Sequence, residues 1–566
     1  MPRARYTFPG SHAHSSQWKK AFTAVTYQIT QGGITYIVAA DGFGTHLNSA
    51  VLGVNDDIII SVALVYINAL GGGELYCEEG TYTLTATVTW YANICLKGVG
   101  YNTHWTAAGN FHLITIAGIS NVCIEDMRLS GTSTGHNVDC VFCDSAVLTT
   151  DIHLIRIYVT NSDRYGFRFE GTLWVRDVWI IECHITNTDL DGISAEGLSR
   201  SMIIGNYIYL TGQSGINIVN QYDYGVISGN VIFGCGLHGL TITMSMSYLA
   251  ITGNVTGEHT GSGINVVLLN FGYVSITGNI SFESHLSGIY VSGSQFLISS
   301  NFIYDNAENG ITLGGGCIDG LISSNDIVGL SGLSQQDGIE LETGAKNILI
   351  IGNYIINQEV DGISLVGNND DCNINGNYLN GNGAYGIDIE AATCERNLVK
   401  DNYYLNNVTS AIRDLGTDTR THEDIIDPED RDATIVAGDH PAAQMLDDVS
   451  TTVRFGFGAK SEFQELVSAR VVIVPVANGT LRRQVSTQFG KVCSGEAYNA
   501  HSDAIAAGNV DGMTANEIEC IDVSAALTGL AARDTVGMRF IRDATAGSGD
   551  TIAGTVWVKE LRIRFV

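Results

Sequence analysis

The chain has 566 residues and carries 59 Asp and Glu against 29 Lys and Arg, which gives a formal net charge of −30. A protein of this charge repels phosphate backbones and anionic lipid surfaces, so nucleic acid is excluded as an expected partner. Because 45% of the residues are hydrophobic, the chain can fill a large core, which excludes an intrinsically disordered protein.

The N-terminal segment, residues 1–84, begins with MPRARYTFPGSHAHSS, which lacks the apolar stretch of a secretory signal. Its longest apolar run, 58–70, is too short and too interrupted to span a bilayer, so no membrane insertion is expected. Asn55, Asp56 and Asp57 precede this run and three glycines end it, which predicts a helix over about 56–70. A helix at this place would cap the open end of the apolar interior that the following repeat predicts.

A repeat of about 24 residues fills the segment 85–415. A Gly followed by alternating apolar residues recurs at intervals of 22 to 28 residues, at Gly166, Gly192, Gly215, Gly239, Gly263, Gly288, Gly310, Gly338, Gly362 and Gly386. A second landmark is an Asn with Ile or Val three residues before it, at Asn206, Asn230, Asn254, Asn279, Asn301, Asn325, Asn353, Asn377 and Asn402. Repeats with this period are typical of solenoids.

Each repeat predicts one three-sided coil of short strands. One strand follows the Gly, a second precedes the Asn and a third follows it. The apolar period is 2, which excludes a helical solenoid, and the Ile column is expected to fill the interior at about 4.8 Å per coil. The Asn is expected at a bend, in the left-handed conformation, with its side chain hydrogen-bonded from coil to coil. The fold class is therefore all-β, a parallel β-helix.

The repeat ends after Asn402. Residues 416–432 are polar and charged and contain Pro428, which predicts a linker. Residues 433–566 contain alternating runs such as ARVVIVPVA and TVWVKELRIRFV, which predict a C-terminal β-sandwich.

Two segments resemble a known family. NDDIIISVALVYINALGGGELYCEEGTYTL resembles the start of the pectate-lyase-like right-handed parallel β-helix of phage tailspikes, and DTVGMRFIRDATAGSGDTIAGTVWVKELRIRFV is similar to sandwich domains that end viral fibre proteins. The resemblance implies a polysaccharide ligand, a homotrimer formed through the C-terminal domain, and a virion or extracellular location without a classical secretory signal. No catalytic motif of the family can be matched residue by residue.

The resemblance also implies that sugar lies along the outer face of the strands that follow the repeat Gly. Glu170 and Glu196 occupy the same outward position on adjacent coils, about 5 Å apart, which suits a retaining glycosidase. Asp163 and Asp189 match three residues before the glycines. These four are the candidate catalytic residues, and the expected substrate-binding residues nearby are Arg164, Tyr165, Arg168 and Trp174. The alternative interpretation of the cluster is a solvated acidic patch.

Other groups have weaker patterns. Glu342 and Glu390, two coils apart at about 9.5 Å, with Glu340 and Asp388 beside them, could form an inverting pair or bind Ca²⁺, the one cofactor considered. Two loop pairs, Glu258 with His259 and Glu283 with His285, could supply a general base or a metal site. Of the twelve cysteines only Cys140 and Cys143 are close in sequence, and no second pair completes a zinc motif, so no metal site is predicted.

Three functions remain open from the sequence. The first is a virion tailspike or fibre that depolymerises cell-surface polysaccharide. Hydrolysis is favoured over lyase chemistry because no Lys lies on the outward columns. The second is a structural or receptor-binding fibre without turnover. The third and weaker one is a free polysaccharide lyase or epimerase.

Overall fold

The computed structural model describes residues 23–565 except 32–33, 42–44, 54–55, 133–137, 145, 147, 172–174, 246–247, 269–272, 330–334, 421, 427, 429–431, 438–439, 461–462, 464, 492–496 and 498. The chain divides into two compact units, and the division passes through β40 (Tyr378–Asn380). The first unit comprises 1–372 and 380–384, and the second comprises 373–379 and 385–566.

The first unit begins with an antiparallel meander of β1 (Ala24–Gln31), β2 (Ile34–Asp41) and β3 (His46–Val51), followed by α1 (Asp56–Ala69). The helix prediction is confirmed. Asp56 and Asp57 are buried at its start, and Asp56 accepts hydrogen bonds from the backbone N–H groups of Gly53 at 2.8 Å and Thr83 at 2.7 Å. These carboxylates tie the helix to the first coil, and β1 pairs in parallel with β4 of that coil.

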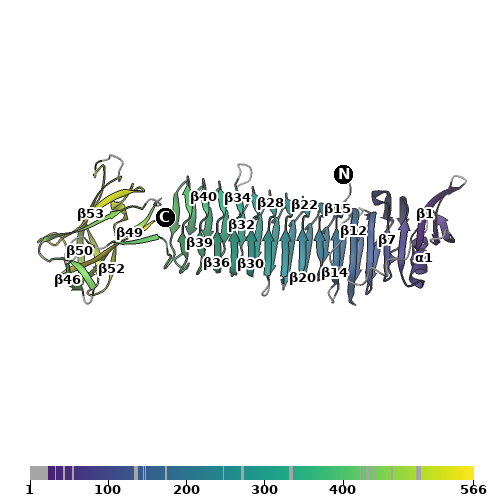
Figure 1. The fold of residues 1–566 in the computed structure, drawn as a ribbon, viewed down its shortest axis with the longest axis horizontal. Helices are drawn as coiled ribbons and strands as arrows, with labels where there is room; N and C mark the ends of the chain where they lie inside the picture. The colour runs from purple at the N-terminus through teal and green to yellow at the C-terminus, as the bar shows by residue number, and fades with distance from the viewer. Residues whose placement is uncertain are drawn as a thin grey trace. The chain divides into compact units, whose positions relative to one another are not determined.

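The rest of this unit is a stack of three-sided coils (Figure 1). We call the sheet after the repeat Gly sheet 1. Its strands are β6 (Val88–Thr89), β9 (Ile114–Ala117), β11 (Val141–Asp144), β13 (Phe167–Glu170), β16 (Ile193–Ala195), β20 (Ile216–Asp223), β23 (Leu240–Ser245), β26 (Ile264–Leu268), β29 (Ile289–Ser292), β32 (Ile311–Leu313), β35 (Ile339–Leu341) and β38 (Ile363–Leu365).

Sheet 2 precedes the Asn landmark. Its strands are β4 (Gly73–Cys77), β7 (Ile94–Lys97), the first parts of β10 (Ser120–Ser130) and β12 (Thr149–Ser162), β14 (Val175–Ile181), β17 (Leu198–Ser199), β18 (Met202–Ile204), β21 (Gly225–Ser228), β24 (Tyr248–Thr252), β27 (Tyr273–Thr277), β30 (Ser294–Ser299), β33 (Ile318–Ser323) and β36 (Lys346–Ile351).

Sheet 3 follows the Asn. Its strands are β5 (Gly80–Leu84), β8 (Thr103–Ala107), the second parts of β10 and β12, β15 (His184–Thr188), β19 (Tyr207–Thr211), β22 (Val231–Phe233), β25 (Val255–Gly257), β28 (Ile280–Phe282), β31 (Phe302–Tyr304), β34 (Asp326–Val328) and β37 (Tyr354–Ile356).

The coils stack in register, so each side chain rests on its counterpart in the next coil. Ile227, Ile251 and Ile276 are direct Cα partners, and all three are fully buried. The repeat glycines allow the coils to close around this interior, because a Cβ at Gly215 would lie 2.3 Å from Cγ2 of Ile232.

The Asn column forms the predicted ladder. The side-chain oxygen of Asn254 accepts from the backbone N–H of Asn230 at 3.0 Å and from its Nδ2 at 2.9 Å, and Asn230 Nδ2 also donates to the carbonyl of Ile203. The prediction that the Asn itself is left-handed was wrong. The positive φ falls on the preceding residue, as at Gly229 (64°), because the Asn side chain turns inward to reach its ladder partners.

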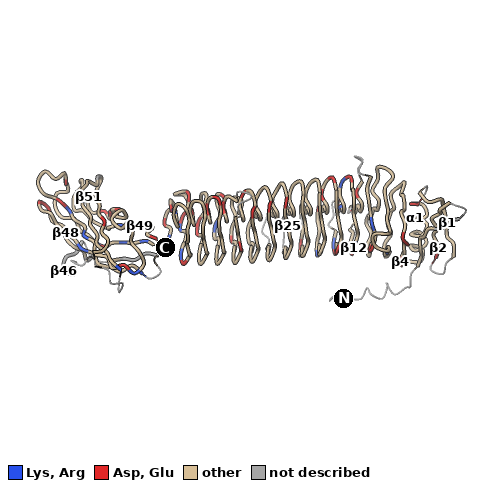
Figure 2. The backbone as a smooth tube through the Cα atoms, turned by 90° about the horizontal axis from the view of Figure 1, so that it is seen from above, with Lys and Arg blue, Asp and Glu red and all other residues tan. Residues whose placement is uncertain are grey.

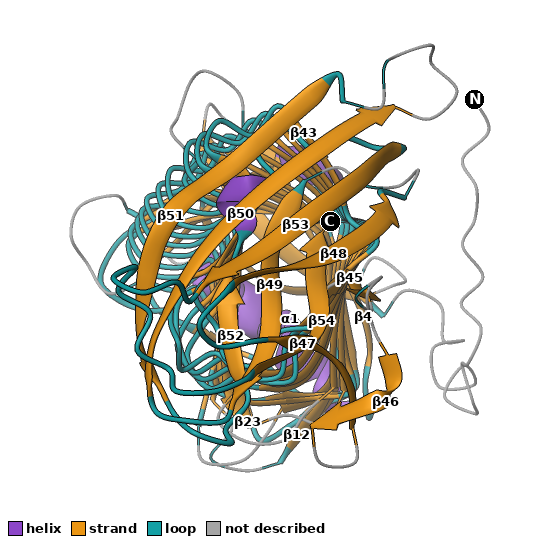
Figure 3. Ribbon diagram, turned by 90° about the vertical axis from the view of Figure 1, so that its left-hand side faces the viewer, coloured by secondary structure: helices purple, strands orange, loops and turns teal. Residues whose placement is uncertain are grey.

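The second unit begins with β39 (Asn373–Asn375), β41 (Tyr385–Ile389), β42 (Leu398–Lys400), β43 (Tyr403–Leu405) and β44 (Ser410–Asp414), which continue the coil pattern. Two antiparallel sheets follow. One has the order β46-β47-β54-β49-β52 with β45 also on β54, and the other has the order β48-β53-β50-β51, whose four strands lie side by side in Figure 3. The bounds are β45 (His422–Ile426), β46 (Asp432–Ala437), β47 (His440–Met445), β48 (Ser450–Gly458), β49 (Leu466–Pro475), β50 (Gly479–Lys491), β51 (His501–Met513), β52 (Glu519–Asp522), β53 (Asp534–Asp543) and β54 (Val556–Phe565).

These sheets share one core, to which both contribute buried side chains such as Phe455 and Phe540 from one sheet and Val471 and Leu561 from the other. The segment 416–432, predicted as a linker, contains β45, which pairs with β54. A polar segment can form a strand at a sheet edge because the pairing uses backbone N–H and C=O groups and does not depend on the side chains.

Candidate functional site

The outer face of sheet 1 carries the predicted carboxylate pair on adjacent rungs. Arg168 of β13 is the register partner of Ser194 of β16, and the backbone N–H of Glu196 donates to the carbonyl of Phe169 at 2.9 Å. Glu170 and Glu196 therefore follow one another along the same outward column, and both side chains reach solvent. A third carboxylate extends this column, because Asp144 of β11 is the register partner of Glu170.

The other two candidate catalytic residues lie at the bends before these strands. Asp163 is 5% exposed and accepts a hydrogen bond from Thr132 Oγ1 at 2.7 Å. Asp189 is exposed, and its backbone N–H donates to the carbonyl of Ser162 at 3.0 Å. Asp163 is therefore a buried bend residue, and Asp189 is open to solvent.

The structure adds a buried carboxylate that the sequence reasoning missed. Asp139 is fully buried beside the predicted basic residues. Its Oδ1 lies 3.7 Å from Nε of Arg164, and its Oδ2 lies 3.7 Å from Nη1 of Arg168 and 3.2 Å from Nδ1 of His112. Oδ1 also accepts from the backbone N–H of Tyr165 at 3.3 Å.

Aromatic rings surround the two guanidinium groups. The Cζ of Arg168 lies 5.0 Å from the ring centroid of Tyr165 and 5.6 Å from that of Phe142. Arg164 lies 5.2 Å from the Tyr165 ring, and the His112 ring packs on Phe142 at 4.6 Å. Such cation–π contacts contribute about 0.5–2 kcal/mol each, more as water is excluded. The site thus presents partly exposed arginines with fixed orientations.

Arg168 joins the buried carboxylate to the exposed column, because its Nη2 forms an ion pair with Glu170. Burial raises the pKa of Asp139, although His112 and Arg164 act in the opposite direction. Burial also lowers the pKa of His112, whose Nδ1 accepts from the backbone N–H of Asp139 at 3.3 Å. The arginines are the permanent cations of this site, because a guanidinium stays protonated in proteins. Trp174, also predicted here, lies outside the described residues.

A sequence signal could have identified Asp139. The residue before the repeat Gly is polar in most coils, and in several of them its side chain accepts a hydrogen bond from the backbone of the next coil. Asp191 accepts from Ser214 N–H at 2.8 Å, and His238 accepts from Ser262 N–H at 2.9 Å. Asp139 holds this position one coil before Tyr165, at a place where Cys140 replaces the Gly.

The carboxylates of the second acidic group, Glu340, Glu342 and Asp388, form hydrogen bonds or ion pairs with neighbouring coils. Glu340 accepts from Asn309 Nδ2, and Glu342 accepts from the backbone N–H of Gly315 at 3.0 Å. In the second unit, Asp388 is 2% exposed and forms an ion pair with Arg413, whose Nε lies 2.6 Å from its Oδ1. An inverting pair or a Ca²⁺ site at these residues stays a prediction.

The two His residues of the loop pairs contact backbone atoms at the bends between strands. His259 is fully buried, its Nδ1 accepts from the backbone N–H of Cys235 at 3.3 Å, and burial lowers its pKa to about 3. His285 Nδ1 lies 2.9 Å from the carbonyl oxygen of His259. A neutral, buried imidazole is suited to packing rather than to surface base chemistry.

A groove of about 700 Å³ on sheet 2 was not predicted. Its wall is a stack of three tyrosines, Tyr224, Tyr248 and Tyr273, which are 50–61% exposed with adjacent ring centroids 5.3 Å apart. Its floor includes Val226 and Leu297. The signal was present in the sequence, because each Tyr lies six residues before an Asn landmark.

Comparisons with known proteins agree with the architecture. A family model described as "Right handed beta helix region" matches residues 113–281 and 265–423, which is more than half of the chain. A comparison with curated proteins found no match. In the described part of the chain, no helix has the length and apolarity that a bilayer crossing requires.

Three solved structures illustrate the likeness. The A-module of the Azotobacter vinelandii mannuronan C-5 epimerase AlgE4 is 20% identical, with 66% of this chain and 97% of that chain covered and a TM-score of 0.43. The Dettilon tailspike protein is 14% identical, with 86% and 90% covered and a TM-score of 0.40. A mutant tailspike of E. coli bacteriophage HK620, solved with a hexasaccharide, is 11% identical, with 89% and 92% covered and a TM-score of 0.42. On the coil geometry and the family model together, the chain belongs to the right-handed β-helix family.

Proposed function

We propose that this protein binds an extended anionic polysaccharide along the outer face of sheet 1. The observation that carries the proposal is the cluster in which buried Asp139 orients Arg164 and Arg168 over the rings of Tyr165 and Phe142. Guanidinium groups match carboxylates in geometry and charge, and aromatic faces contact sugar rings. An acidic sugar is therefore the ligand chemistry that fits.

The charge of the rest of the chain favours this cluster as the binding site of an acidic polymer. The chain carries a net charge of −30, so a polyanion is repelled from most of its surface. Lys and Arg residues occur beside Asp and Glu in the coils around β12 (Figure 2). Arg168 has five N–H donors, and its contacts with Asp139 and Glu170 leave donors for a ligand.

Hydrolysis of the bound chain is the second candidate function. Asp144, Glu170 and Glu196 occupy three successive rungs of one outward column beside the arginines. Adjacent rungs are separated by about 4.8 Å, close to the carboxyl separation of about 5–5.5 Å in retaining glycosidases. We propose Glu170 and Glu196 as the catalytic pair, one acting as the acid and the other as the nucleophile, with Arg168 orienting Glu170.

An array of immobilised neutral and uronate-containing polysaccharides tests the function. We expect binding to at least one acidic polymer, weakened by added salt because the contact is electrostatic. Release of reducing ends without unsaturated-uronate absorbance would identify a hydrolase, and unsaturated products would identify a lyase. Retention of neutral polymers alone would contradict the proposal.

We further propose that the chain acts as a homotrimeric virion tailspike or fibre, and that copies meet at the tyrosine groove of sheet 2 in addition to the C-terminal domain that the resemblance implies. The outward column beside the tyrosines is largely apolar over seven coils: Met202, Val226, Ala250, Ser275, Leu297, Leu321 and Leu349. Such a long apolar stripe is typical of an interface between proteins.

Light scattering tests the assembly. The full chain should scatter as a trimer at micromolar concentration, and Leu297→Glu should shift it toward monomer because a charge would be buried between copies. Leu237→Glu, at a residue that is 45% exposed at the bend between β22 and β23, away from sheet 2, is the matched control and should leave the trimer intact. A monomeric wild-type chain would contradict this assembly.

A further inference from the structure

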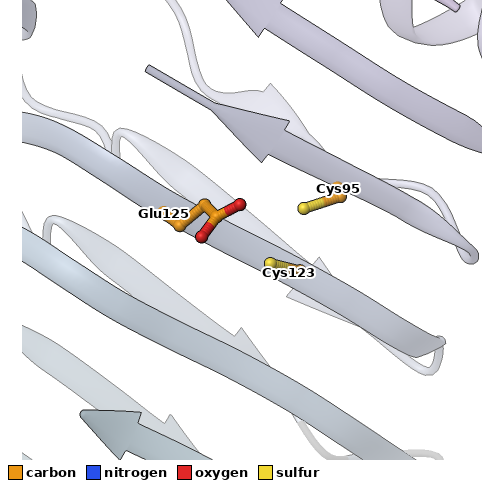
Figure 4. A group of neighbouring side chains, drawn as sticks. All are labelled: Cys95, Cys123 and Glu125. Carbon is orange, nitrogen blue, oxygen red and sulfur yellow. The ribbon is translucent and has the colours of Figure 1, made fainter. Parts of the chain in front are cut away.

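Two cysteines and a glutamate converge on the outer face of sheet 2, in the coils nearest α1. Cys95 of β7 and Cys123 of β10 are direct register partners, and Glu125 is two residues beyond Cys123 on the same face. Ligand atoms of all three residues lie within 4.8 Å of one another. Figure 4 shows the three side chains gathered on two adjacent strands.

We propose that Cys95, Cys123 and Glu125 form a binding site for a thiophilic divalent cation, with zinc as the preferred ion. Zinc accepts Cys sulfur and carboxylate oxygen in tetrahedral sites, and a set of three protein ligands leaves one position for water. The spacing in the sequence gives no zinc motif because the two cysteines are 28 residues apart, and only the stacking of parallel coils brings their side chains together.

The surroundings balance the charge of such a site. Glu125 contacts two cations, with Oε1 3.2 Å from Nζ of Lys97 and Oε2 2.8 Å from Nη2 of Arg156. Two thiolates, Glu125 and Asp126, which also pairs with Arg156 at 2.6 Å, carry four negative charges, and a divalent cation together with Lys97 and Arg156 balances them. Basic neighbours that hold a ligating carboxylate also fix its orientation.

Two further ligand types lie above and below in the same column. Glu74 is the register partner of Cys95, and His153 is the register partner of Cys123. His153 has its own contacts, with its ring stacked on Trp179 at 4.4 Å and its Nε2 3.0 Å from Asp151 Oδ1. We therefore assign the three converging residues as ligands and place water at the fourth position.

The test is metal titration of the full chain after treatment with a phosphine reductant. We expect one Zn²⁺ per chain by calorimetry, and Cd²⁺ should give an ultraviolet thiolate-to-metal charge-transfer band. Cys95→Ser and Cys123→Ser should each abolish that band and weaken binding by about 100-fold or more, since outer-shell changes alone cost about 10–100-fold. Glu125→Gln should retain the band and weaken binding by about 10-fold or more.

The exposed Cys520 provides the control, because Cys520→Ser should bind Zn²⁺ as the wild type does. Thermal unfolding without metal shows whether each variant folds, and added Zn²⁺ should raise the Tm of the wild type but not that of Cys123→Ser. Cd²⁺ uptake that survives Cys95→Ser and Cys123→Ser would overturn the proposal. A reduced wild type that shows no charge-transfer band would do so as well.

Discussion

Ile251→Asp is expected to abolish folding of the coil stack. The side chain of Ile251 is fully buried between Ile227 and Ile276, which are themselves fully buried. An aspartate there would be an unpaired charge out of contact with water, which lowers the free energy of unfolding by several kcal/mol. This loss is larger than that caused by most single substitutions. Each coil is stabilised mainly by its neighbours, so the defect would interrupt the stack. Soluble yield, circular dichroism and thermal unfolding measure the outcome.

The matched control for this variant is Thr277→Asp, which places the same charge one residue after Ile276 on the outward face of β27. It should fold and lose less than about 1 kcal/mol, as most surface substitutions do. An Ile251→Asp protein that unfolds with the wild-type Tm would contradict the in-register interior.

Glu170→Gln and Glu196→Gln are each expected to lower depolymerase activity by at least about 100-fold, since a general acid or base contributes about 10²–10⁴. Both changes keep the shape of the side chain and remove its ability to carry the charge or the proton. Stability should change little, because the Arg168–Glu170 pair that is lost is partly solvent-exposed, and such pairs contribute about 0–1 kcal/mol. Release of reducing ends from the polymer identified on the array measures the activity.

Glu182→Gln serves as the control for these variants, because Glu182 is exposed at the bend between sheets 2 and 3. It should keep wild-type activity. Full activity in both Glu170→Gln and Glu196→Gln would remove the hydrolase proposal and leave polysaccharide binding in place.

Much of the fold was predictable because stacked coils of similar length produce a regular repeat in the sequence. The Gly and Asn landmarks give the coil length, and the Ile three residues before each Asn identifies the interior column. The same counting put Glu170 and Glu196 on adjacent rungs, and the register of β13 and β16 agrees with it. Local geometry was less accurate, as the left-handed residue before each Asn shows.

The remaining features depend on contacts between coils whose period is irregular. Cys95 and Cys123 precede Gly166, the first clear landmark, so their register could not be counted from the sequence, and Asp139 could be placed only by accepting Cys140 in the position of the repeat Gly. The ion pair of Arg168 with Glu170 depends on the conformations of the two side chains, which the repeat pattern of the sequence does not specify. The tyrosine groove differs, because its residues follow the repeat. Their positions could be counted from the sequence, but the stacking of their rings was not predicted.

Replacement of the two arginines tests the central claim most directly. With the acidic polymer from the array, Arg164→Gln and Arg168→Gln should each weaken binding by about 10-fold or more, because a charge-assisted hydrogen bond contributes about 1.5–3 kcal/mol. The control Arg200→Gln removes an exposed arginine that pairs with Asp177, and it should bind like the wild type. Equal affinity of all four proteins, with unchanged Tm values, would show that the polysaccharide does not bind at this cluster.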